Sequence, residues 1–221
     1  MSARVRDVMT ANVVAVRADT SFKDMVALLL SSRVSAFPVV DGAGKVVGVV
    51  SEADMLIKEA DQASPPGTFA GLRRLRDHEK AAAVTAAELM TGSPVTIGPD
   101  QPVEQAAFLM YDRGVKRLPV VDGTGHLVGI VSRVDALSVF GRPDADIRRE
   151  VTEEVILRRF LVDPLLFDVS VRGGIVTLAG RPETDLAGRD IVDAVRHVPG
   201  VVAVRDRLEY LGHHPHSAAS S

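Results

Sequence analysis

A chain of 221 residues can hold one large domain or two to three small ones, and its composition, 46% hydrophobic and 25% charged, is that of an ordinary globular protein. A net charge of -3 and an aromatic content of 4% exclude the basic surface and the stacking platforms that nucleic-acid-binding proteins use. The absence of cysteine excludes disulfides, thiolate catalysis and cysteine zinc sites, and it fits a reducing cytoplasm. The N-terminus has no apolar signal core, and no apolar run approaches the roughly 20 residues of a membrane span. We therefore expect a cytoplasmic protein.

The first part of the chain contains one pattern twice, at a constant offset of 81 residues. A Met-Thr pair, a "PVVDG" stretch and a Gly-x-Val-Ser-x-x-Asp stretch recur in the same frame without a gap over about 50 residues, which indicates a tandem duplication. The aligned pairs include Met9 with Met90, Pro38 with Pro119, Gly48 with Gly129, Ser51 with Ser132 and Asp54 with Asp135.

Each copy predicts the same order of elements. The β-branched runs at 12–16 and 93–97 are typical of strands. Apolar residues at helical spacing from Phe22 predict a helix, and the equivalent helix begins near Pro102 and ends at Gly114. An Asp-Gly turn then joins two strands into a hairpin, and a second helix begins near Glu52 in the first copy and Arg133 in the second. The unit is β-α-β-β-α.

The repeated Ser-x-x-Asp has two interpretations that the spacing leaves open. Ser51 and Ser132 can cap the following helix, with Asp54 and Asp135 closing a capping box. Alternatively, the same residues lie where a strand feeds a helix and free amides favour anions. A hydroxyl there can reach phosphate or ribose, and a carboxylate can accept both ribose hydroxyls. One serine can serve both purposes.

Residues 61–84 separate the copies. Pro65-Pro66-Gly67 cannot continue a helix, although the stretch "LRRLRDHEKAAA" can form a short one. We interpret the segment as a flexible linker, with the alternative that Arg73, Arg74 and Arg76 lean over a cleft and meet phosphate.

After residue 143 the pattern changes. Ile147, Val151 and Val155 share one face of an amphipathic helix, and an alternating hairpin turns at Gly173-Gly174. A second amphipathic helix and a final strand follow, so the order is α-β-β-α-β. The tail 212–221 is predicted to be disordered, and we expect no metal at its His213, His214 and His216.

The two copies resemble a tandem pair of CBS domains, a module that senses adenosine nucleotides. The resemblance rests on the Met-Thr pair, the "PVVDG" hairpin and the Gly-x-Val-Ser-x-x-Asp close, and it covers residues 3–60 and 85–141. It implies an α/β fold in which the two β-α-β-β-α repeats pack as a pseudo-twofold pair and leave two clefts between them. Each cleft would take its Ser-x-x-Asp from one copy and its base-contacting first strand from the other.

The resemblance also implies roles for single residues. The two aspartates would hold ribose, the two serines would reach ribose or phosphate, and the threonines of the Met-Thr pairs would lie near the base. A phosphate-facing position is Lys116 in the second copy, with Arg117 beside it, and Ser35 in the first. The first copy thus departs from the pattern and lacks a cation, so we expect unequal nucleotide sites. The candidate nucleotide-binding residues are Thr10, Ser35, Ser51, Asp54, Thr91, Lys116, Arg117, Ser132 and Asp135.

Residues 144–211 resemble a BON domain, an α+β domain, through the "VSVRGGIVTLAG" hairpin and the "VPGVVAV" join. This resemblance implies contacts with membrane surfaces, phospholipid or proteins, and in some members cation sensing. Acidic residues slightly outnumber basic ones in this segment, which argues against binding to anionic lipid.

No catalytic motif is present, so we expect no enzyme. The function predicted is that of a regulator in which AMP, ADP, ATP or another adenosyl ligand, with or without magnesium, binds the CBS pair and changes how the BON domain is displayed. The alternative is a scaffold that uses the CBS pair only for dimerisation. Both cases imply a homodimer, with a protein partner or a membrane surface for the BON domain and no nucleic acid.

Overall fold

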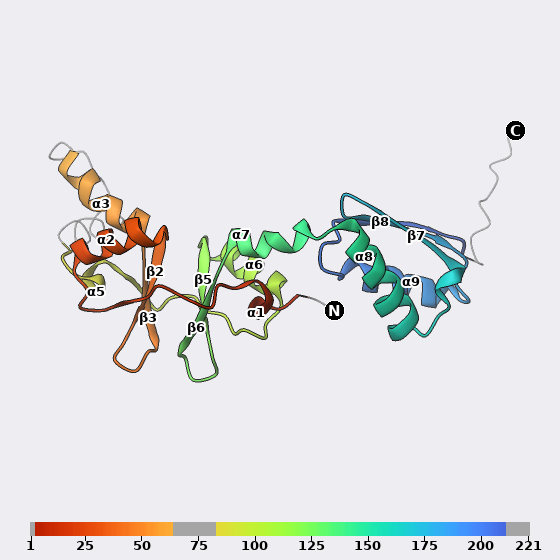
Figure 1. Ribbon diagram of the computed structural model, residues 1–221, viewed down its shortest axis with the longest axis horizontal. Helices are drawn as coiled ribbons and strands as arrows, with labels where there is room; N and C mark the ends of the chain where they lie inside the picture. Colours follow the sequence, from red (N-terminus) through yellow and green to blue (C-terminus); the bar gives the residue numbers. More distant parts are fainter. Residues whose placement is uncertain (1–2, 64–82, 211–221) are drawn as a thin grey trace, which may run out of the picture. The chain divides into compact units, whose positions relative to one another are not determined.

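The computed structural model describes residues 3–63 and 83–210 (Figure 1) and divides into two compact units. One unit spans Arg4–Ala136 and contains both copies of the repeat, and the other begins at Leu137. The predicted linker helix with its three arginines, and the histidines of the tail, lie outside the described residues.

The first copy contains a three-stranded arrangement covered by helices. Its two long strands form an antiparallel hairpin, and a short strand pairs with it in parallel. The helix predicted from Phe22 is present, with Ser21 as its N-cap, and the second helix begins at the predicted Glu52. The elements are α1 Val5–Val8, β1 Val16–Arg17, α2 Phe22–Ser32, β2 Ala36–Val40, β3 Val46–Ser51 and α3 Glu52–Ala63.

The second copy repeats this order. Pro102 is the N-cap of its first long helix, Gly114 follows that helix with φ of +65°, and the last helix begins at Arg133, as the sequence predicted. The elements are α5 Ala86–Leu89, β4 Thr91–Gly92, α6 Val103–Asp112, β5 Arg117–Val121, β6 Leu127–Ser132 and α7 Arg133–Ser138. The predicted fold class, a mixed α/β pair, is confirmed.

The first strand of each copy is shorter than predicted. In the run at 12–16, the assigned strand is only Val16–Arg17. In the run at 93–97, Ile97 alone makes a bridge, to Val120. Pro94 has no N–H to donate to a ladder, which limits pairing within this run.

The N-terminal segments of the copies are exchanged. Helix α1 lies against the second copy, where the Val5 N–H donates to the Gln101 carbonyl at 2.9 Å. Helix α5 lies against the first copy, where the Ala86 N–H donates to the Thr20 carbonyl at 2.9 Å. The two contacts are related by the 81-residue offset, as expected for a pseudo-twofold pair.

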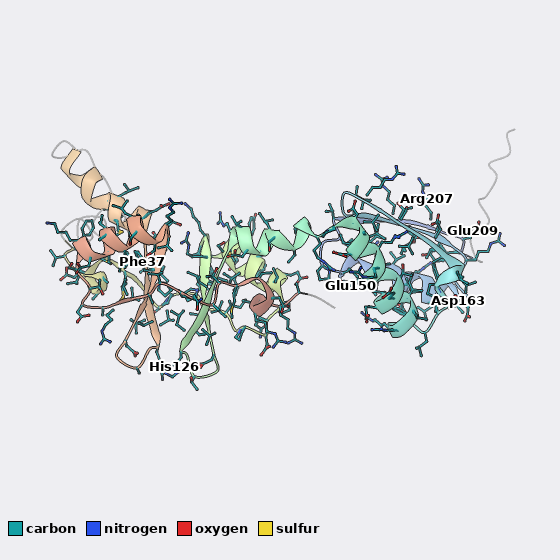
Figure 2. All side chains as sticks on the ribbon, in the orientation of Figure 1. Phe37, His126, Glu150, Asp163, Arg207 and Glu209 are labelled. Atoms are coloured by element: carbon teal, nitrogen blue, oxygen red, sulfur yellow. The ribbon has the colours of Figure 1, made fainter. Side chains whose placement is uncertain are left out.

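The exchange continues through the Met-Thr pairs. Strand β4 pairs antiparallel with β3 of the first copy, with Thr91 opposite Val49. Reciprocally, Thr10 pairs with Ile130 in β6 of the second copy. At the far ends of the hairpins Lys45 bridges to His126, which is labelled in Figure 2. Each copy therefore completes the sheet of the other.

Each copy buries its own apolar centre. In the first copy, Phe37 (Figure 2) and Met25 are fully buried beside Leu89, which comes from the exchanged helix α5. In the second copy, Leu118 and Met110 are at most 1% exposed. The exchanged segments therefore contribute to the cores that hold the pair together.

The second unit has the predicted α-β-β-α-β order. Its two long helical segments pack on one three-stranded sheet in which β8 lies in the middle, antiparallel to β7 and parallel to β9. The first segment changes from an α-helix to a π-helix at Val151. The elements are η1 Val139–Gly141, α8 Asp144–Glu150, η2 Val151–Arg159, η3 Pro164–Leu166, β7 Phe167–Arg172, β8 Ile175–Gly180, α9 Asp185–Arg196 and β9 Ala203–Leu208.

Candidate functional site

The repeated Ser-x-x-Asp forms a reciprocal helix cap in both copies. In the first copy, the Ser51 hydroxyl donates to Asp54 Oδ2 at 2.6 Å, and the Asp54 N–H donates back to Ser51 Oγ at 3.4 Å. In the second copy the same bonds join Ser132 and Asp135 at 2.7 and 3.3 Å. Each serine N–H also donates to the aspartate Oδ2. The capping interpretation is therefore correct for both, and each cap fixes a carboxylate at the start of a helix.

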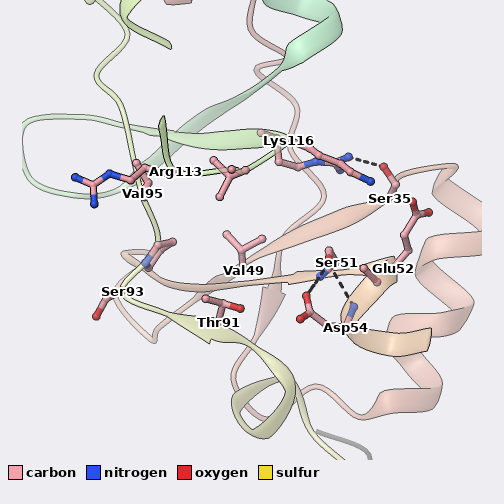
Figure 3. A pocket seen from close by; sticks show the side chains of 15 residues that line it. Ser35, Val49, Ser51, Glu52, Asp54, Thr91, Ser93, Val95, Arg113 and Lys116 are labelled. Atoms are coloured by element: carbon pink, nitrogen blue, oxygen red, sulfur yellow. Dashed lines mark hydrogen bonds between the residues drawn. The ribbon is translucent and has the colours of Figure 1, made fainter. Parts of the chain in front are cut away.

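One of these caps lies in a cleft of about 520 Å³, within the range of small-ligand sites. We call it the Asp54 cleft. Its walls come from both copies, because β3 and α3 meet the segment after β4 and the loop between α6 and β5 (Figure 3). The residues that line it are Ser35, Val49, Ser51, Glu52, Ala53, Asp54, Thr91, Ser93, Pro94, Val95, Arg113, Gly114, Val115, Lys116 and Arg117.

The polar groups of the Asp54 cleft lie in two places. Figure 3 shows Asp54 and Thr91 close together on one side, and Lys116 on the opposite side with its side chain directed toward Ser35. Val49 lies between the two groups, and Val95 adds a second apolar side chain. The cleft therefore offers a carboxylate and a hydroxyl at one end, a cation at the other, and an apolar wall between them.

Arg117 crosses from the second copy to the first. Its guanidinium donates to Ser35 Oγ at 2.5 Å. In the hairpin register it lies opposite Ser132. Burial lowers the pKa of the Arg117 guanidinium from its usual value, and the nearby carboxylates of Glu52 and Asp135 act in the other direction. Arg117 thus places a second positive charge beside Lys116. Its hydrogen-bond partner is Ser35, the first-copy residue at the position where the second copy has Lys116.

The structure brings six of the nine predicted site residues together. Ser35, Ser51, Asp54, Thr91, Lys116 and Arg117 all line the Asp54 cleft. The other three do not line it: Ser132 and Asp135 form the second cap, and Thr10 is held by its backbone pairing with Ile130. Ser35 of the first copy and Lys116 of the second, which occupy equivalent positions of the repeat, therefore line the same cleft.

Two charged residues of the cleft were not among the predicted site residues. Glu52 follows the capping serine directly, and Arg113 is the C-cap residue of α6. The repeat does single out Glu52, because the equivalent residue of the second copy is Arg133. Arg113 has no comparable signal, since a basic residue at the end of a helix is common on any surface.

Two further features bear on the chemistry of the described residues. Residues 3–63 and 83–210 contain no group of three or more His, Asp or Glu side chains that could hold a metal ion. None of the helices in residues 3–63 and 83–210 is long and apolar enough to cross a membrane. The Asp54 cleft has the character of a binding site for a small polar molecule with an anionic end.

Comparison with protein families identifies both units. A model of the CBS domain matches residues 5–61 and again 86–142. The chain belongs to the CBS domain family. A model of the BON domain matches residues 143–212, so the second unit is a BON domain. Both resemblances stated from the sequence are confirmed.

Curated relatives carry the same CBS pair. The chloroplastic CBS domain-containing protein CBSX2 of Arabidopsis thaliana is 34% identical over 144 residues, which are 58% of this chain and 60% of that protein. A CBS domain-containing protein of Dictyostelium discoideum is 30% identical over 139 residues, covering 63% of this chain and 92% of that protein. The chain thus spans less than two thirds of the Arabidopsis relative.

Solved structures show the same fold for the pair. The crystal structure of CBSX2 in complex with AMP aligns with a TM-score of 0.54 at 33% identity, covering 61% of this chain and 93% of that one. The CBS pair of protein MJ0100, in complex with 5'-methylthioadenosine and S-adenosyl-L-methionine, aligns with a TM-score of 0.52 at 24% identity, covering 64% of this chain and 98% of that one. The second likeness concerns the fold alone.

Proposed function

We propose that the CBS pair binds an adenosine nucleotide in the Asp54 cleft and that binding regulates the contacts of the BON domain. The observation that carries the proposal is the composition of this cleft. A capped carboxylate, Asp54, and two cations, Lys116 and Arg117, face one space of about 520 Å³. A nucleoside phosphate has the complementary groups, namely ribose hydroxyls that donate and a phosphate that accepts.

In this proposal Asp54 accepts the ribose hydroxyls. A carboxylate has about four lone-pair sites on its two oxygens, so a cap made through Oδ2 is compatible with further acceptance. Hydrogen bonds to a charged group contribute about 1.5–3 kcal/mol each. Thr91 lies beside Asp54 and, with Val95, faces the base.

The phosphate lies at the other end, against Lys116, Arg117 and the Ser35 hydroxyl. Lysine and arginine are the natural donors to phosphate oxygens, and Ser35 already accepts a bond from Arg117. The cap formed by Ser132 and Asp135 would belong to a second, weaker site. At the position equivalent to Lys116, the first copy has only Ser35. We therefore propose one dominant nucleotide site per chain.

The relative solved with AMP supports the class of ligand. CBSX2 shares 33% of its residues with this chain over the aligned pair, with a TM-score of 0.54. AMP, ADP and ATP share the same sugar and base, so the Asp54 end of the cleft does not select among them. That the chain is not an enzyme stays a prediction.

We further propose that two chains associate through the CBS helices. Leu30 on α2 and Tyr111 on α6 occupy equivalent positions of the repeat and are 71% and 87% exposed. Phe108 on α6 is 58% exposed, and Leu56 on α3 is 63% exposed. Exposed apolar side chains on equivalent helices of both copies suit a self-complementary contact with a second copy of this chain. Light scattering should give the mass of a dimer, and Tyr111→Asp should give that of a monomer.

The nucleotide proposal is tested by thermal unfolding of the full chain with AMP, ADP, ATP and adenosyl compounds, each with and without Mg²⁺. A ligand at 100 times its dissociation constant should add about 2.7 kcal/mol to the free energy of unfolding of the unit that binds it. The matched control is Asp54→Asn, which, if it weakens binding at least about tenfold, should reduce the effect to about 1.4 kcal/mol or less. The competing function is a scaffold that dimerises without a ligand, and it predicts no shift with any of these compounds in either protein.

A further inference from the structure

The residue that follows the capping serine differs in charge between the two copies. It is Glu52 in the first copy and Arg133 in the second, although the flanking Gly, Ser and Asp of the motif are identical. Of these two residues, Glu52 lines the Asp54 cleft and Arg133 does not. The cleft therefore contains an acidic residue at a position where the repeat also tolerates a basic one.

Glu52 lies at the cationic end of the cleft. Its N–H donates to the Ser35 carbonyl at 3.0 Å, which anchors its backbone beside the serine that Arg117 contacts. Its carboxylate interacts electrostatically with the Arg117 guanidinium. Figure 3 shows the Glu52 side chain directed toward Ser35, as is that of Lys116. The side chain is exposed, so it faces whatever extends out of the cleft at this end.

The charges at this end suit one phosphate better than several. Lys116 and Arg117 supply two positive charges and Glu52 supplies one negative charge, whereas a phosphate monoester alone carries about -1.5 to -2 at pH 7. The third basic residue of the described lining, Arg113, lies away from Ser35 (Figure 3), so we expect each further phosphate at this end to add negative charge near the Glu52 carboxylate. The negative charges of the added phosphate and of the Glu52 carboxylate repel each other, more strongly in a cleft than in bulk water.

We propose that Glu52 is a specificity-determining residue that makes the Asp54 cleft prefer an adenosine monophosphate over the di- and triphosphate. The inference rests on the proposed function, because it names the ligand class for the same cleft. Glu52 acts by repulsion of the wrong ligand, which is a common way of obtaining specificity.

The test is calorimetric titration of the full chain with AMP, ADP and ATP in the absence of Mg²⁺. The wild type should bind AMP at least about tenfold more tightly than ATP. Glu52→Gln should reduce this ratio at least about threefold, because the affinity for ATP should rise more than the affinity for AMP. Glu52→Arg, which introduces the residue of the second copy, should reduce the ratio further. Mg²⁺ should narrow the ratio in the wild type, because it neutralises part of the ATP charge.

The matched control is Glu153→Gln, which removes the same charge from an exposed residue of the BON domain. It should leave the ratio of affinities unchanged. An unchanged ratio in Glu52→Gln and Glu52→Arg, or equal binding of AMP and ATP by the wild type, overturns the role of Glu52 while nucleotide binding stands. If the wild type binds none of the three nucleotides, the proposed function and this inference are both wrong.

Discussion

The side chain of Met90 fills the space into which any side chain at Gly48 would project. Met90 comes from the start of the second copy and Gly48 from β3 of the first, so the contact joins the two copies. Met9 occupies the equivalent space at Gly129. The repeated methionine and the repeated glycine are thus two halves of one contact, made twice, that lets each Met-Thr pair lie on the sheet of the other copy.

Gly48→Ala should therefore destabilise the CBS pair. A methyl group there would overlap the Met90 sulfur, with Cγ at 2.8 Å and Cβ at 3.0 Å. Overpacking of this kind costs about 1–3 kcal/mol. Gly129→Ala should cost less, because its three nearest atoms are the outer Met9 atoms Sδ at 2.5 Å, Cγ at 3.1 Å and Cε at 3.2 Å, whereas at Gly48 the less mobile Cβ of Met90 is also in contact. Urea unfolding at neutral pH measures both differences.

The control is Gly123→Ala, where a methyl group would meet nothing within 4 Å. It should change the urea midpoint little. The double variant Gly48→Ala/Met90→Ala should lose less free energy of unfolding than the two single variants lose together. Met90→Ala removes the side-chain atoms that a methyl group at Gly48 would strike. Additive costs would contradict the contact.

The sequence predicted the elements that local patterns determine. Helix α2 follows from the spacing of its apolar residues, and each hairpin follows from its Asp-Gly turn. The exchange of α1 and α5 was not predicted, because it depends on pairing between residues far apart, such as Thr91 with Val49. The first strands were predicted too long, since β-branched residues around Pro94 indicate extended backbone and not a ladder partner.

The candidate site was predicted as a set of residues and not as a geometry. The repeat pointed to both aspartates, yet it could not tell which of them shares a cleft with Lys116. That pairing is decided by how the two copies pack, which places Asp54 and not Asp135 in the cleft that Lys116 lines. Glu52 was visible only as a difference in charge between two otherwise equal motifs.

The two hairpin turns should differ in their dependence on pH. Bonds from the Thr124 hydroxyl and from backbone N–H groups lower the pKa of Asp122 to about 2. The pKa of Asp41 in the first copy is also lowered, chiefly by the Lys45 N–H. A lowered pKa in the folded state gives stability that is present above the unfolded value near 3.9 and is lost as the pH falls toward 2.

Asp122→Ala should therefore lower the urea midpoint at pH 6, and its difference from the wild type should shrink between pH 4 and pH 2. Asp41→Ala should show a smaller difference at pH 6, because the Ala43 and Lys45 N–H groups donate to Asp41 and Ala43 has no hydroxyl where the second copy has Thr124. A difference from the wild type that stays constant from pH 6 to pH 2 would mean that the ionised turn contributes nothing.

The BON domain should fold without the CBS pair. Its core consists entirely of residues from Ile147 to Leu208. A fragment of residues 137–212 should unfold cooperatively on heating, measured by circular dichroism. Ile191→Ala, at a fully buried position, should cost about 2–5 kcal/mol. Leu186→Ala, on the same helix but 70% exposed, is the matched control and should cost little. A fragment without a cooperative transition would show that the domain depends on the rest of the chain.

The central claim is that the carboxylate of Asp54 binds ribose as well as capping α3. Titration calorimetry of AMP into the full-length Asp54→Asn variant tests it, with Asp135→Asn as the comparison. If Asp54 accepts both ribose hydroxyls, Asp54→Asn should weaken AMP binding at least about tenfold, because 1.4 kcal/mol corresponds to a factor of ten. Asp135→Asn should have a smaller effect, and 2',3'-dideoxy-AMP should bind the wild type and Asp54→Asn equally weakly. If Asp54→Asn binds AMP as tightly as the wild type, Asp54 is only a helix cap in the first copy, and if Asp135→Asn does so as well, the repeated motif has no role in binding ribose.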